Sequence, residues 1–105
     1  MKIVEKDGFN RIVEVYALYW VDGIRHHLVI PYEGYDGFIV VNEDQCDVVD
    51  SSINGFILKK DDYGGDMLIH WAAEKGGLIY KLTDPPDADA VAELKRRLAE
   101  EKPPF

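Results

Sequence analysis

The chain has 105 residues, with 20 acidic side chains against 12 basic ones and a formal net charge of −8. This excess argues against nucleic-acid binding as the main task, because neutralising phosphates requires clustered Lys and Arg. The length fits one domain, which we place at residues 1–105, and 47% hydrophobic residues suffice for a packed core.

The chain carries no obvious export or membrane signal. Its N-terminus lacks an apolar signal-peptide core, and no run approaches the roughly 20 apolar residues that cross a bilayer. The single cysteine, Cys46, precludes an intrachain disulfide, as is usual in a reducing compartment. We therefore expect a cytoplasmic protein that does not contact membranes.

Most of the chain has the pattern of an antiparallel β-sheet. Turn signals recur at short intervals and separate runs rich in Val, Ile, Tyr and Phe. Tight turns between these runs favour antiparallel pairing of neighbours. The predicted strands are Lys2–Lys6, Arg11–Val21, Ile24–Tyr32, Phe38–Asn42, Asp47–Ile53, Phe56–Lys60, Met67–Ala73 and Leu78–Thr83.

The C-terminal segment predicts one helix, over about residues 85–101. Asp84 can cap its N-terminus, Pro85 suits its first position, and Glu93 and Arg97 form a favourable i,i+4 pair. The expected fold class is therefore α+β, mostly β: an antiparallel twisted sheet or half-barrel of about six to eight strands with one C-terminal helix. The apolar stripe that should dock this helix is narrow and contains Ala90, Val91, Leu94 and Leu98.

A tight hairpin organises the N-terminal half. Taking Asp22-Gly23 as a two-residue turn pairs Val21 with Ile24, and continuing outward pairs Tyr16 with Val29. The adjacent histidines His26 and His27 then point to opposite faces of the sheet and cannot chelate one ion from a regular strand. The His26 face is nearly all apolar, so we expect His26 in the core and His27 on the surface.

The opposite face of the hairpin is aromatic. It places Tyr16, Leu18 and Trp20 in a row, with Arg25 and His27 at the rim. Two interpretations remain open: the C-terminal helix covers this face, or the face binds a partner, since aromatic residues and Arg are enriched at interface hot spots.

No sequence motif identifies a particular enzymatic reaction. The candidate metal donors His26, His27, His70 and Cys46 have none of the familiar ligand spacings, and we expect no metal and no cofactor. The acidic loops lack the calcium-loop pattern, and no glycine-rich phosphate cradle or nucleophile elbow is present. The loop after His70 predicts a hairpin that pairs Trp71 with Tyr80.

These observations favour a small, non-catalytic, acidic interaction protein. Its most concrete version is a bacterial immunity or inhibitor protein that neutralises a basic partner such as a toxin. One alternative is a ligand-binding or hydrolytic half-barrel with His27 or His70 as general base, and another is a homodimer formed through the aromatic face. The candidate partner-binding residues are Tyr16, Leu18, Trp20, Arg25, His27, Asp44, Asp47, Asp50, Asp61 and Asp62.

Overall fold

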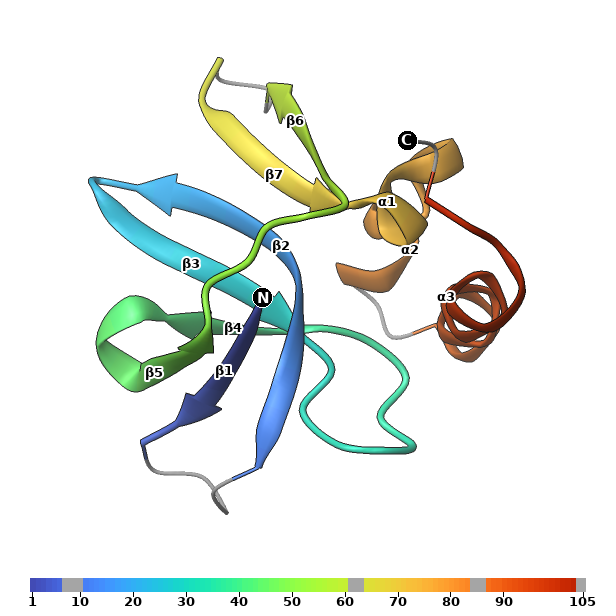
Figure 1. Ribbon diagram of the computed structural model, residues 1–105, viewed down its shortest axis with the longest axis horizontal. Helices are drawn as coiled ribbons and strands as arrows, with labels where there is room; N and C mark the ends of the chain where they lie inside the picture. The colour runs from blue at the N-terminus through green and yellow to red at the C-terminus, as the bar shows by residue number, and fades with distance from the viewer. Residues whose placement is uncertain (7–10, 61–63, 84–86, 104–105) are drawn as a thin grey trace.

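A curved antiparallel sheet with a helical layer on one side forms the molecule, which confirms the predicted α+β, mostly β fold (Figure 1). The computed structural model describes residues 1–6, 11–60, 64–83 and 87–103. Within these residues the strands are β1 (Lys2–Glu5), β2 (Ile12–Val21), β3 (Ile24–Val29), β4 (Ile39–Asn42), β5 (Cys46–Asp50), β6 (Phe56–Lys60) and β7 (Asp66–His70).

The long strand β2 holds the sheet together because it has different neighbours along its two halves. Its first half pairs with β1 and its second half pairs with β7, while β3 runs along its other edge. The main path is β4-β3-β2-β1-β5, and β6 pairs only with β7. The result is an open half-barrel in which β4 and β5 are the two ends of the main path. The short 3-10 turn η1 (Glu43–Gln45) joins these two strands.

A β-bulge in β2 changes which residues share a face. The predicted register holds from Val21 opposite Ile24 to Ala17 opposite Leu28, and then shifts so that Val15 lies opposite Val29. The predicted pairing of Tyr16 with Val29 is therefore wrong. A bulge inserts one residue and turns the following side chains over, so Tyr16 packs on the same side as Ala17.

Both faces of the sheet are packed, one under the helices and the other inside the half-barrel. We call the first group the helix-side cluster. Its members from the sheet are Ala17, Leu28 and Ile69, joined by Phe38 just before β4. We call the second group the barrel cluster, and its buried members are Ile3, Val15, Leu18, Val29, Val41 and Cys46.

The segment after β7 is helical, so two predicted strands need correction. The predicted strand Met67–Ala73 ends at His70, and α1 (Trp71–Glu74) begins there. The predicted strand Leu78–Thr83 is wrong, because Ile79–Thr83 forms the helix α2. The turn η2 (Lys75–Gly77) lies between them. The left-handed φ angles of Gly76 and Gly77, 67° and 71°, reverse the chain there and remove the predicted Trp71–Tyr80 hairpin.

The predicted C-terminal helix is confirmed as α3 (Ala88–Glu100), with a different start. Asp87 is its N-cap and accepts a hydrogen bond from the Ala90 amide at 3.1 Å. The predicted cap Asp84 and first-turn Pro85 lie outside the described residues. The Glu93–Arg97 pair is confirmed at 3.0 Å.

The helix α3 packs against the other two helices and reaches only part of the sheet (Figure 1). Its residues Ala90, Val91 and Leu94 are buried in the helix-side cluster, whereas Leu98 is 40% exposed. Arg97 fastens α3 to α1 by donating from Nη1 to the carbonyl oxygens of Ala72 and Lys75, at 2.8 and 2.7 Å. The half of the sheet near the β2–β3 turn is consequently left without a helical cover.

Candidate protein-binding surface

The three predicted aromatic and apolar anchors do not form one surface. Tyr16 is half-buried on the helix side, where its ring stacks on Phe38 with 5.6 Å between centroids. Leu18 is buried in the barrel cluster, and only Trp20 is substantially exposed, at 44%. The prediction that Tyr16, Leu18 and Trp20 share one face of the hairpin is therefore wrong for Tyr16, because the bulge moves it to the helix side.

The two adjacent histidines have the opposite of their predicted environments. His27 is fully buried, while His26 is half-buried beside Tyr19 near the turn of the hairpin. The Nδ1 of His27 donates to the Val41 carbonyl at 2.8 Å, and its Nε2 accepts from the Nε of Arg25 at 3.0 Å. Burial lowers the pKa of His27, so this ring is a neutral structural element with both nitrogens occupied.

Arg25 is tied inward as well. Besides its bond to His27, its backbone amide donates to the Glu43 carboxylate at 2.9 Å. This contact fixes η1 against the start of β3. Of the two predicted partner-binding residues, His27 is therefore buried within the half-barrel, while Arg25 is half-buried and engaged with His27 and Glu43.

His70 caps a helix. Its Nδ1 accepts a hydrogen bond from the Ala72 amide at 3.1 Å, at the start of α1. The rings of Tyr16, Phe56 and Trp71 surround it, with centroids 5.5 to 5.7 Å away. Burial lowers the pKa of His70 from 6.5 to about 4, and the chain's amino terminus adds to this effect. In the described part of the chain no histidine is hydrogen-bonded to a carboxylate, the arrangement that would support a general base.

The lowered pKa of His70 predicts a pH-dependent stability. The unfolded side chain binds a proton at about pH 6.5 and the folded one only near pH 4, so the free energy of unfolding should fall as pH drops between these values. The variant His70→Asn keeps an oxygen acceptor for the cap but cannot titrate there. Urea unfolding at several pH values should show a smaller fall for the variant. Parallel curves for the two proteins would contradict the role of His70.

The acidic segment that forms η1 and β5 is exposed along its length. Asp44, Asp47 and Asp50 are exposed, as is the intervening pair Val48 and Val49, at 38% and 50%. The other two predicted acidic residues, Asp61 and Asp62, lie outside the described residues. Cys46 is the only buried residue of β5, and burial raises the pKa of its thiol, which disfavours the thiolate form.

Negative charge in this segment is not balanced by ion pairs. Among the described residues, the ion pairs between side chains lie in the β6–β7 hairpin and around the helices, as in Lys59–Glu74 and Lys95–Glu33. No such pair involves Glu43, Asp44, Asp47 or Asp50. This segment therefore carries negative charge that has no ion-pair partner among the described residues. Sequence reasoning found these carboxylates but missed the exposure of the valines between them. The run "DVVD" has no alternation of polar and apolar residues that would separate exposed from buried positions.

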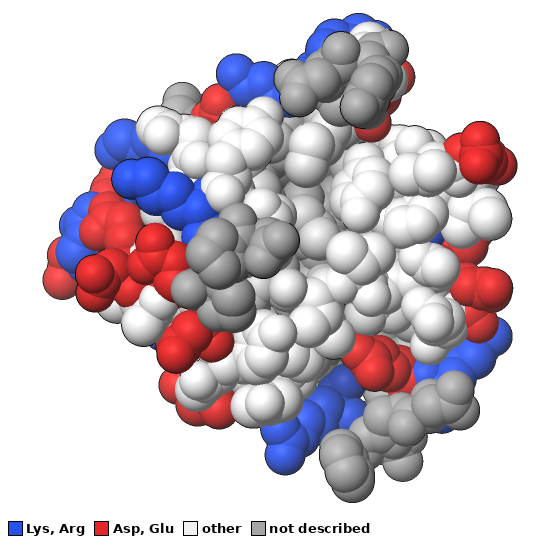
Figure 2. Space-filling model, turned by 180° about the vertical axis from the view of Figure 1, so that it is seen from behind, with Lys and Arg blue, Asp and Glu red and all other residues white. Residues whose placement is uncertain are grey.

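A second surface lies where the helices leave the sheet uncovered. The view from behind Figure 1 shows a broad area without charged side chains (Figure 2). An uncharged groove of about 340 Å³ lies between the sheet and α2, and Val40 and Tyr80 are prominent exposed residues beside it. Sequence reasoning missed this groove because α2 was assigned as a strand. Its lining residues are Tyr19, Leu28, Phe38, Val40, Met67, Ile79, Tyr80 and Thr83.

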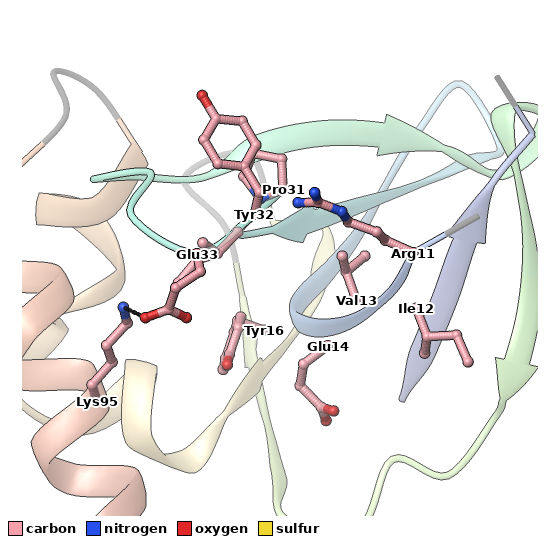
Figure 3. A pocket seen from close by; sticks show the side chains of 10 residues that line it. Arg11, Ile12, Val13, Glu14, Tyr16, Pro31, Tyr32, Glu33 and Lys95 are labelled. Carbon is pink, nitrogen blue, oxygen red and sulfur yellow. Dashed lines mark hydrogen bonds and ion pairs between the residues drawn. The ribbon is translucent and has the colours of Figure 1, made fainter. Parts of the chain in front are cut away.

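A separate cleft of about 360 Å³ opens beside Tyr16, and its lining contains both acidic and basic residues (Figure 3). Lys95 of α3 reaches across to Glu33 at 3.1 Å, and Glu14 and Arg11 come from the start of β2. Burial, with a contribution from Glu14, raises the pKa of Tyr16 to about 12, so its phenol stays protonated at neutral pH. Its described lining residues include no histidine.

Comparisons of the chain with protein-family models, with curated proteins and with solved structures found no match. Within the described residues no helix is long and apolar enough to span a membrane. In the same residues no group of three or more His, Cys, Asp and Glu side chains is arranged to hold a metal ion.

Proposed function

We propose that this chain is a non-catalytic interaction protein that binds a basic protein partner through the acidic segment of η1 and β5. The observation that carries the proposal is the run of exposed carboxylates at Asp44, Asp47 and Asp50, which have no ion-pair partner among the described residues. Exposed, uncompensated charge speeds the encounter with an oppositely charged surface and penalises acidic competitors. An immunity or inhibitor protein for a basic toxin is the most concrete form of this function.

The states of the histidines also favour binding over catalysis. His27 is fully buried with both ring nitrogens engaged, and His70 uses its Nδ1 to cap α1. A general base must be free to accept a proton from a substrate in a cleft, and these two rings are committed to the fold.

The test of this function is the ionic-strength dependence of association with a lysine-rich peptide or a basic protein. Steering by η1 and β5 predicts that added salt slows association and that replacing Asp47 and Asp50 weakens this dependence. An association rate that does not respond to salt would overturn the proposal.

The uncharged groove supports a second candidate, the binding of a small apolar ligand. A groove of about 340 Å³ falls in the usual size range of small-molecule sites, and none of its described lining residues is charged. A dye that fluoresces in apolar sites is expected to bind the native protein, and Val40→Lys, which places a charge at the mouth, should weaken this binding about tenfold. Val49→Lys on β5 is the matched control. Equal dye binding by both variants would contradict a site in the groove.

A further inference from the structure

We propose that the free edge of β5 accepts an extended segment of the partner as an additional strand, with an apolar residue opposite Val48 and Lys or Arg on either side of it. This inference rests on the proposed function, since it specifies how the acidic segment would hold a basic partner. Strand addition of this kind draws affinity from main-chain hydrogen bonds and specificity from alternate side chains.

The backbone of β5 is unpaired on one side. Strand β5 ends the path β4-β3-β2-β1-β5, so β1 is its only neighbour in the described sheet. The amide of Lys6 donates to the carbonyl of Gln45 at 2.9 Å, so this carbonyl points toward β1. Because backbone groups alternate sides along an extended strand, the N–H and C=O groups of Val48, which is 38% exposed, point to the free edge, whereas Cys46 is buried. The backbone of Val48 can therefore pair with an incoming strand.

The surroundings of Val48 determine which kind of residue of the incoming segment fits opposite it. Val48 lies opposite Ile3, which is fully buried in the barrel cluster, and shares its face of β5 with buried Cys46. Val48 nevertheless stays 38% exposed. An apolar residue placed opposite Val48 would extend the barrel cluster and cover the exposed part of this valine.

The carboxylates near Val48 determine which residues of the incoming segment fit on either side of the apolar one. Asp47 projects from the opposite face of β5, and Asp44 and Asp50 stand near its two ends. Cross-strand neighbours of opposite charge attract and like charges repel, so Lys or Arg beside Asp47 is favoured. The same repulsion disfavours a second copy of β5 at this edge, as charges on edge strands commonly do.

The other end of the sheet path lacks these properties. Near the two ends of β4, the amide of Phe38 donates to the carbonyl of Leu82 at 3.0 Å, and the amide of Asn42 donates to the side chain of Gln45 at 2.9 Å. These bonds engage the two ends of the β4 edge from within the chain and leave Val40 between them. The edge strand β6 carries Lys59 and Lys60, which pair with Glu74 and Asp66, so its described residues offer no uncompensated carboxylate to a basic segment.

The test uses a short, labelled peptide that alternates Lys and Val, together with the same peptide N-methylated at alternate residues. Methylation keeps the charge and side chains but removes the amides that would pair with β5. The parent peptide is expected to bind, to slow hydrogen exchange at the amide of Val48, and to bind at least about tenfold more tightly than the methylated peptide. Equal binding of the two peptides, no binding, or unchanged exchange at Val48 would overturn strand addition.

Matched charge variants separate this inference from the proposed function. Asp47→Asn with Asp50→Asn removes two carboxylates of β5, and Asp36→Asn with Asp89→Asn removes two exposed ones elsewhere. The β5 variant should bind both peptides more weakly than the control variant does. If the β5 variant loses affinity while methylation has no effect, strand addition fails and the charge-based function stands. If methylation matters while the two variants bind alike, the charge-based function fails and the edge still accepts a strand.

Discussion

Replacing Asp47 and Asp50 together with lysine is expected to slow association with a lysine-rich peptide by at least about tenfold at low ionic strength. Each replacement changes the charge by two, so the net charge moves from −8 to −4. Both residues are exposed on β5 and lack ion-pair partners in the described residues, so the reversal turns an attractive local field into a repulsive one. Stopped-flow fluorescence at increasing salt would measure the rate.

The control for this prediction carries the same change in net charge at another place. Asp36→Lys with Asp89→Lys also gives −4, at two exposed positions, one in the loop before β4 and one in the first turn of α3. We expect this variant to retain most of the association rate and most of its salt dependence, because local charge dominates within a Debye length of about 8 to 10 Å. If both variants slow association equally, net charge and not the β5 segment controls the encounter.

Leu94→Ala is expected to destabilise the fold by about 2–5 kcal/mol, the usual range for truncating a fully buried leucine. Leu94 has no exposed surface and lies on α3, in the helix-side cluster with residues of α1 and α2. Its truncation would leave a cavity between the helices, which can close only partly. The free energy of unfolding from urea titrations would give the value.

Leu98→Ala on the same helix is the matched comparison. Leu98 is 40% exposed, so we expect its truncation to cost less than about 1 kcal/mol. Both variants substitute the same residue types in the same helix, which removes helix propensity as an explanation for a difference. Equal losses, or a small loss for Leu94, would contradict the docking of α3 on the other helices.

Turn and pairing rules were sufficient to predict the β2–β3 hairpin from the sequence. They did not predict how its two faces are buried. Asp22-Gly23 set the turn, and the predicted register is correct as far as Ala17 opposite Leu28. The bulge beyond that point has no signature in the sequence. The environments of His26 and His27 were reversed because both faces of this hairpin are packed, by different parts of the chain, and apolar alternation does not tell which face is covered near the turn.

The short helices were missed for a different reason. Helices α1 and α2 contain four and five residues, which is too short for helical periodicity to appear. Trp71, Ile79 and Tyr80 favour strands when only local propensity is considered, and the packing of α3 overrides that preference. Because α2 forms one wall of the uncharged groove, this groove could not be predicted either.

The exposure of the predicted acidic residues could be inferred from the sequence, and the exposure of the aromatic and apolar ones could not. Asp44, Asp47 and Asp50 lie at polar turn-flanking positions, where charged side chains are normally exposed. The exposure of Tyr16 and Leu18 depended on long-range packing of β1, β5 and the helices. That packing places Leu18 inside the half-barrel and leaves Trp20 outside it.

A titration of the isotope-labelled protein with a lysine-rich peptide, followed by the backbone amide resonances, tests the central claim most directly. Binding at the acidic segment predicts that the largest shifts fall in η1 and β5, from Glu43 to Asp50, and that they diminish as salt is added. Largest shifts around Val40 and Tyr80 in the uncharged groove, or shifts that do not respond to salt, would contradict it.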